Sequence, residues 1–580
     1  MSHNGRRRAN GRPTSQWGEQ RGAARGTPDR PYDYDWIVIG SGFGGSVSAL
    51  RLAEKGYRVA VIEQGRRFQD HELPSSTRDV RDFLWAPEAG ARGILRVVPY
   101  KDVTVLTGVG VGGGSLVYFQ VSLRPPRQFY RDPQWGGLED WESVLAPHYA
   151  MAEQMLGVAT VPFDDPGDSA LIAVAEEMGK PHGKVNTAVF YGEPGVTVPD
   201  PYFGGEGPPR RGCIRCGKCV FGCRYNAKNT LPRNYLYLAE RRGAEVLPDR
   251  RVIQVRPLAG VEDGSLGYEV MYAGAHRGRV KLTTRGVVFS GGAIGTNELL
   301  RACKDSGALP RISDRLGRVF RTNSEAVMAV TADDRRADYT QRPQITGGFF
   351  PDDHTMIQSM TPGPEGELFR LMFAQMTSKG RARRRAVSLG AKVLTHPRFP
   401  LTALRPNAWA KRTIMLLVMQ TSDNRLQLRA SRRPGGGLQT EQNSRKPNPT
   451  YIEAAHEAAA RLAHIIGGTP LGFIGESAAN IPATAHPLGG VVIGADESTG
   501  VIDRHHHVFG YQNMLVCDGA AVSANAGINP SLTIAAMAEH AMSHIPVKPG
   551  AVHRRVEVHT PPPQPFLAPD PGRSPVEAMA

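Results

Sequence analysis

The sequence has no hydrophobic run long enough to cross a membrane. The longest compact apolar run, Ile414–Met419, is far shorter than the roughly 20 residues of a membrane-spanning helix. Paired arginines stand near the N-terminus, but polar residues follow where a signal peptide has its apolar stretch. We therefore expect a cytoplasmic protein with neither a signal peptide nor a transmembrane span.

Cysteine is also scarce, with 6 in 580 residues. Four of them fall between Cys213 and Cys223, so the cysteines do not form a general disulfide framework, and their scarcity is typical of a reducing compartment. A chain of this length can bury two or more hydrophobic cores without covalent cross-links.

Acidic residues are missing from one strongly basic segment. The chain has a net charge of +15, of which residues 379–412 contribute +10 without a single acid and residues 1–31 contribute +5. The remainder of the chain is therefore neutral. Because the charge is confined to two segments, we exclude a generally basic nucleic-acid-binding protein.

Both ends of the chain lack hydrophobic periodicity. Residues 1–31 are rich in Gly, Arg, Ser and Pro and are predicted to form a disordered basic arm, and residues 551–580 are predicted to form a disordered proline-rich tail. Between them, short apolar strands alternate with helix-like segments, which indicates an α/β architecture.

A dinucleotide-binding pattern opens the folded part. An apolar strand at 36–39 precedes Gly40, Gly42 and Gly45, and Glu63 stands at the end of the next apolar strand. In this pattern the first glycine permits a tight turn, the second lets the backbone approach a pyrophosphate, and the third lets the following helix pack closely. The acid can accept hydrogen bonds from ribose hydroxyls, and the helix N-terminus attracts the phosphates.

A second glycine cluster favours FAD over a nicotinamide dinucleotide. Residues 108–114 hold five glycines flanked by apolar residues, so this backbone is predicted to pass close to a flat or charged group. Flavin enzymes, which enclose the isoalloxazine ring, often have such a second loop, whereas nicotinamide enzymes do not need one. A third glycine-rich strand end, at 287–293, suits the return of the chain beneath the adenine.

Three C-terminal motifs carry a family resemblance. Residues 485–490 read AHPLGG, residues 515–519 read LVCDG, and residues 527–534 read GINPSLTI. Together with the N-terminal pattern, they resemble the glucose–methanol–choline (GMC) oxidoreductases, and within these the sequence is most similar to the cholesterol oxidases of actinobacterial type. The resemblance covers about residues 34–545. It implies FAD-dependent oxidation of an alcohol to a ketone, with hydride transfer to flavin N5.

The same resemblance implies the domain organisation. We expect an α/β fold (α+β overall) in which a Rossmann-like FAD-binding domain is interleaved with a substrate domain built on an antiparallel sheet. The FAD-binding domain is expected from residues 32–135, 205–325 and 480–548, and the substrate domain from residues 136–204 and 326–479. Further cofactor contacts are expected at Gly108, Gly112, Gly113, Gly114, Ser115, Val252, Asp518, Gly519, Asn529 and Ser531. For Asp518 the alternative is a simple turn residue.

His486 and Asn529 match the two family residues that converge on the substrate hydroxyl. A neutral imidazole is a suitable acceptor for the hydroxyl proton. The alternative for His486 is a structural histidine. Asn529 precedes Pro530 and an apolar, alanine-rich segment, so it could instead be the N-cap of a helix with proline at its first position.

Two departures from the family pattern concern the substrate. Cholesterol oxidases that also isomerise the steroid double bond carry a glutamate base, and Gln358 aligns with that position. Because glutamine cannot carry a proton at neutral pH, we expect isomerisation to be weak or absent. Tyr118 stands where the better-known secreted enzymes have an asparagine.

Two clusters have metal-ligand character. Cys213, Cys216, Cys219 and Cys223 have the spacing of a ferredoxin run, but the fourth cysteine of such a run serves a second cluster, and no second run exists here. Arg224 also replaces the usual proline. An iron–sulfur cluster, a zinc site and a tight loop of reduced cysteines all remain open. Residues 505–507 are three consecutive histidines, which we interpret as a turn because neighbouring side chains point in different directions. We predict no metal ligands among the site residues.

Residues 366–412 combine the basic charge with apolar side chains. They could be a solvated basic insertion or an interfacial segment that holds the protein on an anionic membrane while the substrate enters. The expected partners are a sterol or other apolar alcohol and O2 or another electron acceptor. A dehydrogenase that passes electrons to a quinone or protein acceptor, and a non-catalytic flavin- or lipid-binding protein, are the alternatives.

Overall fold

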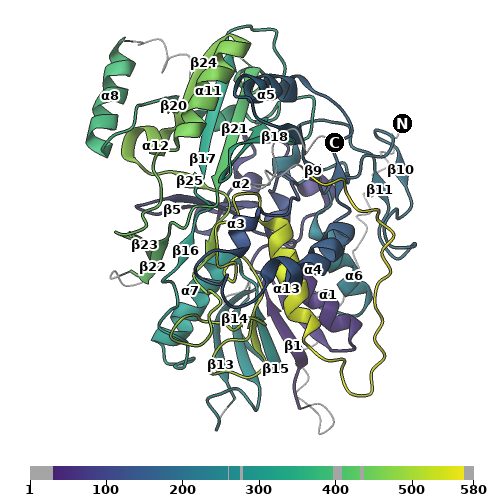
Figure 1. The fold of residues 1–580 in the computed structure, drawn as a ribbon. Coiled ribbons are helices and arrows are strands. Elements are labelled where there is room, and N and C mark those ends of the chain that lie inside the picture. The colour runs from purple at the N-terminus through teal and green to yellow at the C-terminus, as the bar shows by residue number, and fades with distance from the viewer. Residues whose placement is uncertain (1–30, 259, 275–277, 396–407, 432–436, 567–580) are drawn as a thin grey trace, which may run out of the picture.

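The computed structural model describes residues 31–258, 260–274, 278–395, 408–431 and 437–566 (Figure 1). The predicted arm at 1–31 therefore lies almost entirely outside the described residues, as does the end of the predicted tail from residue 567 onward. None of the described helices combines the length and the apolar character needed to cross a bilayer.

A seven-stranded sheet forms the half of the molecule that contains the dinucleotide pattern. Its strands are β1 (Tyr34–Ile39), β2 (Val59–Ile62), β12 (Glu245–Leu247), β13 (Arg251–Pro257), β14 (Tyr268–Ala273), β15 (Arg279–Phe289) and β27 (Met514–Val516). Parallel pairing joins β12, β2, β1, β15 and β27, while β14 and β13 extend the sheet in antiparallel fashion. Both faces of β1 and β2 are buried, which is why these strands are continuously apolar.

Four helices pack together beside this sheet: α1 (Phe43–Glu54), α4 (Trp141–Met155), α6 (Tyr235–Arg241) and α13 (Ser531–Ser543) (Figure 1). On α1 every residue is buried, because the helix is enclosed by the sheet and by α6 and α13. A further helix, α7 (Gly292–Asp305), follows β15 and packs against β13.

A second seven-stranded sheet is antiparallel throughout. Its order is β20 (Phe373–Gln375), β24 (Gly468–Phe473), β17 (Ala326–Ala332), β21 (Thr413–Gln420), β19 (Thr355–Met360), β18 (Ile345–Asp352) and β8 (His182–Lys184). The helices α5 (Pro166–Glu177) and α11 (Glu453–Ile466) cover one face. Along β21, Ile414, Leu416 and Val418 pack under these helices, while Met415 and Leu417 alternate to the opposite face. The mixed α/β class and the antiparallel second sheet are confirmed.

The remaining elements are short. One small sheet contains β5 (Leu95–Pro99), β6 (Thr104–Gly108) and β25 (Ala483–Thr484), and another contains β16 (Phe320–Arg321), β22 (Leu426–Ala430), β23 (Leu438–Gln442) and β26 (Leu488–Gly489). Two-stranded pairs are β3 (Trp85–Ala86) with β4 (Ala91–Arg92), β7 (Ala159–Thr160) with β9 (Asn186–Thr187), and β10 (Thr197–Val198) with β11 (Arg210–Arg211). Apart from α8 (Ala382–Thr395), which has 14 residues, the other helices are short: α2 (Val80–Phe83), α3 (Arg127–Tyr130), α10 (Trp409–Arg412) and α12 (Ile474–Ala479).

Two segments lie elsewhere than expected. The helix α4 falls in the range predicted for the substrate domain, but it packs against α13, and the Tyr149 hydroxyl donates to Thr533 Oγ1 at 3.0 Å. Residues 551–566 were expected to lack packing, and that prediction is wrong for this part of the tail. Val556 is buried, its N–H donates to Glu54 Oε1 at 2.8 Å, and Phe566 packs against Phe350. The apolar side chains among the prolines allow this extended packing.

Candidate functional site

A cavity of about 840 Å³ receives side chains from both large sheets. One part is lined by the glycine-rich turns that follow β1, β6 and β15. The other part is lined by apolar side chains of the second sheet and its surroundings, such as Met360, Met415, Leu417 and Phe473. Of the predicted site residues, this cavity brings together Gly40, Gly42, Glu63, Gly108, Gly113, Gly114, Val252, His486, Asp518, Gly519, Asn529 and Ser531.

The three glycines of the dinucleotide pattern differ in what surrounds them. Gly40 has a φ of +102°, and a Cβ there would lie 2.3 Å from Ser290 O. A Cβ on Gly45 would lie 2.0 Å from Gly40 O, so Gly45 allows α1 to approach the turn. A Cβ on Gly42 would meet no protein atom within 4 Å. Gly42 therefore keeps space free for a group that is not part of the chain.

Glu63 lies at the end of β2, buried against the same turn. Its carboxylate accepts from the Ser41 N–H at 3.0 Å, the Ser41 hydroxyl at 2.7 Å and the Gly65 N–H at 2.9 Å. Burial raises the pKa of Glu63, and these three donors oppose that shift. The hydrogen bonds hold the carboxylate where the pattern predicts the ribose contact.

The second glycine cluster lies directly across the dinucleotide turn. A Cβ on Gly113 would come within 2.8 Å of Gly42 Cα, so the two backbones meet closely. Gly112 and Ser115 do not line the cavity, so their cofactor contacts stay a prediction, and Gly45 also lies outside the lining, in its predicted role of letting α1 pack closely. The Gly112 N–H donates to Ser41 Oγ, and the Ser115 hydroxyl donates to Gly112 O. Both residues therefore stabilise the conformation of the glycine-rich loop without facing the cavity.

Asp518 is tied to the start of α7. Its buried carboxylate accepts from the Gly292 N–H at 2.9 Å, Thr296 Oγ1 at 2.5 Å and the Ala520 N–H at 2.8 Å. Burial raises the pKa of Asp518 to about 6, and the three donors oppose the shift. Two of these donors, Gly292 and Thr296, lie in α7, so Asp518 is more than a simple turn residue.

His486 is paired with a residue that the sequence did not suggest. Its Nδ1 lies 2.5 Å from Glu325 Oε1, and the Glu325 side chain is fully buried. The same carboxylate accepts from Thr484 Oγ1 at 3.0 Å and the Ala485 N–H at 2.9 Å. With Nδ1–H directed at a carboxylate, Nε2 is the nitrogen left to accept a proton, and both residues line the cavity. Glu325 stands 161 residues before His486, so no local motif could have revealed the pair.

Asn529 does not act as the helix cap. Pro530 itself holds the cap position, α13 begins at Ser531, and no side chain caps the helix, so the capping alternative is wrong. Instead, Asn529 Oδ1 accepts from Gln358 Nε2 at 2.8 Å. This bond occupies the oxygen and leaves the Asn529 NH2 group to donate into the cavity, which Asn529 lines. The structure thus places Gln358 beside Asn529.

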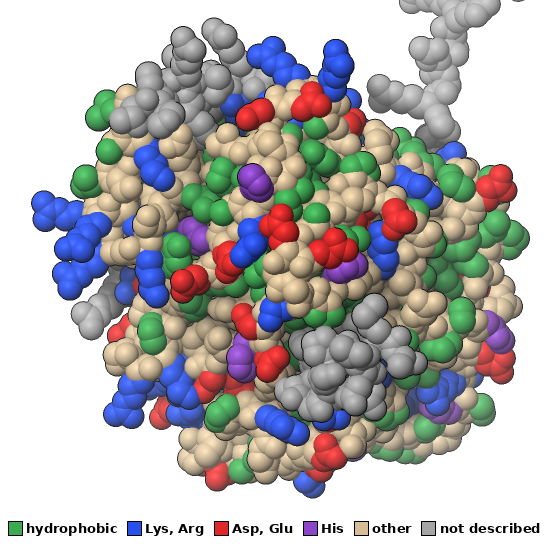
Figure 2. Space-filling view, turned by 45° about the horizontal axis from the view of Figure 1, so that its top comes forward, with side chains coloured by type: hydrophobic (Ala, Val, Ile, Leu, Met, Phe, Trp, Pro, Cys, Tyr) green, Lys and Arg blue, Asp and Glu red, His purple; other side chains and the backbone are tan. Residues whose placement is uncertain are grey.

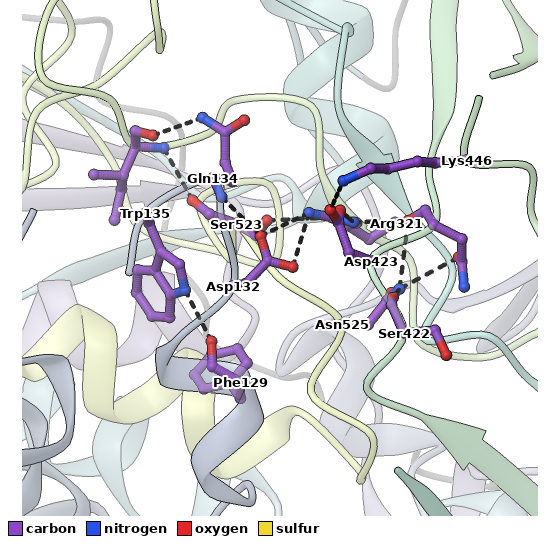
Figure 3. A network of polar contacts seen from close by, with 12 residues as sticks. Phe129, Asp132, Gln134, Trp135, Arg321, Ser422, Asp423, Lys446, Ser523 and Asn525 are labelled. Atoms are coloured by element: carbon purple, nitrogen blue, oxygen red, sulfur yellow. Dashed lines mark hydrogen bonds and ion pairs between the residues drawn. The ribbon is translucent and has the colours of Figure 1, made fainter. Parts of the chain in front are cut away.

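A buried arginine network supports the loops that carry both residues (Figure 3). Arg321 binds both oxygens of Asp132 at 3.0 Å and Asp423 at 2.7 Å, and its side chain is fully buried. Arg321 lies in β16, which pairs with β26 just after His486. Asn525 belongs to the same network and donates to Ser422 O at 2.7 Å, which anchors the segment that leads to Asn529.

The four clustered cysteines line a separate cavity of about 170 Å³. Burial raises the pKa of the Cys213 thiol to about 12. It also lowers the pKa of Lys228, which lines the same cavity, to about 7, against the opposing effect of Cys219 and Cys223.

Neighbouring histidines in 505–507 point apart, as predicted: His506 is fully buried and its Nδ1 lies 2.9 Å from Val516 O, whereas His505 and His507, two residues apart, are partly exposed. Asp503, His505 and His507 each offer a ligand atom within 4.8 Å of the others, and they are the one such group among the described residues. The turn itself is as expected, with the Asp503 carboxylate accepting from the backbone N–H groups of both histidines. The prediction of no metal ligands stays untested.

The residues present fit an FAD molecule. The open space beside Gly42, the glycine-lined passage, the buried Glu63 at the end of β2 and the large cavity are the features that a dinucleotide with a flat ring system requires. Next to them lie a histidine paired with a carboxylate and an asparagine with a free NH2 group. The fold and this site define an FAD-dependent alcohol oxidoreductase.

Comparisons with known proteins agree with this class. Family models described as GMC oxidoreductase match residues 209–317 and 374–538, and an FAD binding domain model matches residues 35–75. A cholesterol oxidase from Mycobacterium tuberculosis is 43% identical over 540 residues, which cover 90% of this chain and 93% of the relative. A cholesterol oxidase from Acinetobacter baumannii is 39% identical over 530 residues, covering 89% and 95%. The chain belongs to the GMC oxidoreductase family.

Solved structures share the fold at low sequence identity. The pyridoxine 4-oxidase from Mesorbium loti has a TM-score of 0.58 at 15% identity, with 88% of this chain and 98% of that chain covered. An FAD-dependent oxidoreductase from Chaetomium thermophilum has a TM-score of 0.56 at 15% identity, with the same coverage.

Proposed function

We propose that the protein oxidises the 3β-hydroxyl of a sterol, such as cholesterol, to the ketone. Bound FAD supplies a two-electron acceptor for the hydride that leaves the carbinol carbon. O2 or another acceptor then removes these electrons. The single observation that carries the proposal is the lining of one cavity. His486, which is paired with Glu325, and Asn529 line it together with the glycine-rich turns and a set of large apolar side chains.

His486 and Asn529 have complementary tasks in this reaction. The Nε2 atom of His486 accepts the hydroxyl proton, and the Glu325 carboxylate stabilises the resulting imidazolium through Nδ1. The NH2 group of Asn529 donates to the substrate oxygen and orients it. Gly42, Gly113, Glu63 and Asp518 would hold the cofactor.

The apolar part of the cavity suits a rigid hydrocarbon substrate. Its lining includes Met360, Met415, Leu417, Phe473 and Phe369, none of which is charged. The 39–43% identity to cholesterol oxidases over most of the chain supports the same substrate class.

Anaerobic mixing with a panel of steroid and non-steroid alcohols, followed through the flavin absorbance, tests this function. We expect 3β-hydroxysteroids to bleach the flavin and the His486→Ala variant to bleach it about 10²- to 10⁴-fold more slowly. His464→Ala, at an exposed position, is the matched control. Bleaching only by non-steroid alcohols would contradict the sterol proposal, and an unbleached flavin throughout would favour a non-catalytic flavin- or lipid-binding protein. O2 consumption compared with dye reduction separates an oxidase from a dehydrogenase.

We further propose that the protein docks on an anionic membrane beside the mouth of this cavity. Five hydrophobic side chains that line the cavity are also 40–56% exposed: Val80, Val97, Leu368, Leu371 and Ile474. Ile474 begins α12, which packs against α8. A hydrophobic rim next to a basic helix is typical of an interfacial contact.

The charge available for this contact is smaller than the sequence suggests. Of the ten basic residues in 379–412, Arg385 and Arg412 are buried, Lys392 donates to Met376 O, and Lys411 lies 3.5 Å from Asp338. Arg398 and Arg405 lie outside the described residues. The exposed cations are Lys379, Arg381, Arg383 and Arg384, and α8 also exposes Val387 and Leu394. Figure 2 shows Lys and Arg side chains projecting at the left edge, the side on which α8 lies in Figure 1.

Vesicle co-sedimentation tests the docking. Phosphatidylcholine vesicles with phosphatidylglycerol should bind the protein, and reversing two charges in Arg383→Glu/Arg384→Glu should weaken binding at least about tenfold, because each basic residue near the surface contributes about 1 kcal/mol. The control, Arg554→Glu/Arg555→Glu, changes the charge equally in the tail beside α1. Equal binding by both double variants would contradict the proposal, and so would binding that does not depend on the phosphatidylglycerol content of the vesicles.

A further inference from the structure

Four thiols that the reaction above does not use lie around one cavity. Cys213, Cys216, Cys219 and Cys223 line the 170 Å³ cavity, and none of them forms a disulfide. This volume is several times the roughly 30 Å³ share of one water molecule in the liquid. The space is therefore large enough for a ligand of several atoms.

The spacing of the thiols disfavours a single metal ion. Around one tetrahedral zinc with Zn–S bonds of about 2.3 Å, the sulfur atoms would stand about 3.8 Å apart. Within the described part of the chain, no three of these sulfur atoms lie within 4.8 Å of one another. In an iron–sulfur cluster each cysteine thiolate binds a different iron atom. The sulfur atoms of the cysteines therefore stand farther apart, around a central space that the cluster fills.

The loop backbone has the form of an anion-binding nest. Arg215, Gly217, Gly222 and Cys223 all have a positive φ, between +57° and +100°. The two non-glycine residues adopt this conformation although it is uncommon for them. Successive right- and left-handed residues turn backbone N–H groups toward one point, as in many iron–sulfur sites.

Two buried cations of the cysteine region lack an acidic partner in the described structure: Lys228, which lines the cavity, and Arg210, three residues before Cys213. Arg210 and Lys228 are 1% and 2% exposed, and neither forms an ion pair with a carboxylate among the described residues. One guanidinium nitrogen of Arg210, Nη1, has no hydrogen-bond partner, and Lys228 Nζ donates only to the carbonyls of Leu116 and Cys219. Buried cations of this kind require a nearby anion.

We propose that Cys213, Cys216, Cys219 and Cys223 bind a [4Fe–4S] cluster that takes electrons from the reduced flavin. Four thiolates give such a cluster a net negative charge, which Arg210 and Lys228 balance. The cavity lined by all four cysteines and the two buried cations without a carboxylate partner in the described part of the chain independently favour this ligand.

The cysteine cavity lies one residue layer from the flavin cavity. Val220 lines the large cavity, while its neighbours Cys219 and Phe221 line the small one. Lys228 Nζ bridges the two regions, because it lies 4.9 Å from the ring centre of Tyr118, which lines the large cavity. The wall between the cavities is therefore thin enough for electron transfer.

The electron balance is complete and rests on the proposed alcohol oxidation. One alcohol gives two electrons as hydride to the flavin and one proton to His486. The electrons leave the reduced flavin one at a time. Each electron reduces the cluster by one unit of charge. A one-electron acceptor of the cytochrome or ferredoxin class reoxidises the cluster before the next electron arrives. The one proton that remains on the flavin after both electrons have left, and the proton held by His486, pass to solvent.

Iron and acid-labile sulfide measured on anaerobically purified full-length protein test the binding. We expect about four of each per chain and an electron paramagnetic resonance signal after dithionite reduction. Cys219→Ser should lose both, whereas the matched variant Cys303→Ser, at a buried cysteine in α7, should retain them. Flavin content and thermal unfolding check that both variants fold. Full flavin occupancy without iron, or one zinc per chain, would overturn the proposal.

Alcohol-dependent ferricyanide reduction tests the relay. In Cys219→Ser this rate should fall at least about tenfold, while anaerobic bleaching of the flavin by the alcohol is unchanged. An unchanged ferricyanide rate would overturn the relay. If no alcohol bleaches the flavin, the proposed alcohol oxidation fails, but the iron, sulfide and resonance measurements still decide whether the cluster is bound.

Discussion

Single residues decide the chemistry of this site through pairs that are distant in sequence. His486 is held by Glu325, and Asn529 is held by Gln358, 171 residues away. In each pair the second residue, Glu325 or Gln358, fixes the orientation of the first. The positioning residues Glu325 and Gln358 can therefore be tested by substitution, as can the two residues that would contact the substrate.

Replacing Glu325 by glutamine should slow the reaction without preventing folding. Glutamine can still accept a hydrogen bond from Nδ1, but it lacks the negative charge that favours the protonated imidazole. We expect kcat to fall about tenfold or more, and the acidic limb of the kcat/KM profile to move to lower pH. A uniform loss of rate with an unshifted profile would indicate that Glu325 is only structural.

Gln358→Glu should give the protein steroid isomerase activity. The wild-type product should keep its double bond in the original position, whereas the variant should form the conjugated enone, seen by its ultraviolet absorbance and by chromatography. A carboxylate opposite Asn529 Oδ1 should turn the amide, so oxidation should slow by about tenfold, on the scale of a lost hydrogen bond. Gln344→Glu, in the same cavity but bonded to Thr361 O, is the control. Conjugated product from the wild type would contradict the prediction.

At the scale of elements, short strands and loops connect the two large sheets at the site. The strand β16 pairs with β26 and carries Arg321, whose partners come from the FAD-binding half and from the loop after β21. The backbone of Arg321 pairs with Leu488, two residues after His486, and its side chain donates to Ser523 O in the segment that leads to Asn529.

Removing this arginine should destabilise the protein strongly. In Arg321→Met, Asp132 and Asp423 lose their buried partner, which should cost about 3–5 kcal/mol of unfolding free energy. Urea denaturation of the flavin-loaded protein measures this cost. Arg318→Met, on the exposed surface nearby, should change stability by less than about 0.5 kcal/mol. Similar losses in both variants would contradict a special role for Arg321.

At the scale of the whole molecule, buried histidines couple folding to pH. Burial lowers the pKa of His506 to about 4 and that of His540 to about 3, and it also lowers the pKa of His148 and His544. These groups bind protons more readily in the unfolded chain. Their contribution to stability is therefore complete above about pH 6.5 and is lost as the pH falls toward 4.

The free energy of unfolding should fall by several kcal/mol between about pH 6.5 and pH 4. Asp518, whose pKa burial raises to about 6, opposes this trend but is outnumbered. His540→Gln keeps a donor for Arg504 O and removes one titrating group, so its urea-denaturation curve against pH should be flatter. His553→Gln, at an exposed site, should leave the curve unchanged. Parallel curves for all three proteins would refute the assignment to His540.

The sequence by itself determined the dinucleotide-binding half and the cofactor. The β1–α1–β2 unit, its glycines and Glu63 are local in sequence, because turn geometry and strand burial act over a few neighbouring residues. The motif around His486 likewise identified the family.

Only the tertiary structure decided which residues support these motifs. The partner Gln358 lies in β19 and Glu325 directly precedes β17, and no local pattern specifies contacts across more than 150 residues. The same holds for the cysteines: their spacing left zinc and an iron–sulfur cluster open, and the separation of the thiols around a cavity, which is set by packing, favours the cluster.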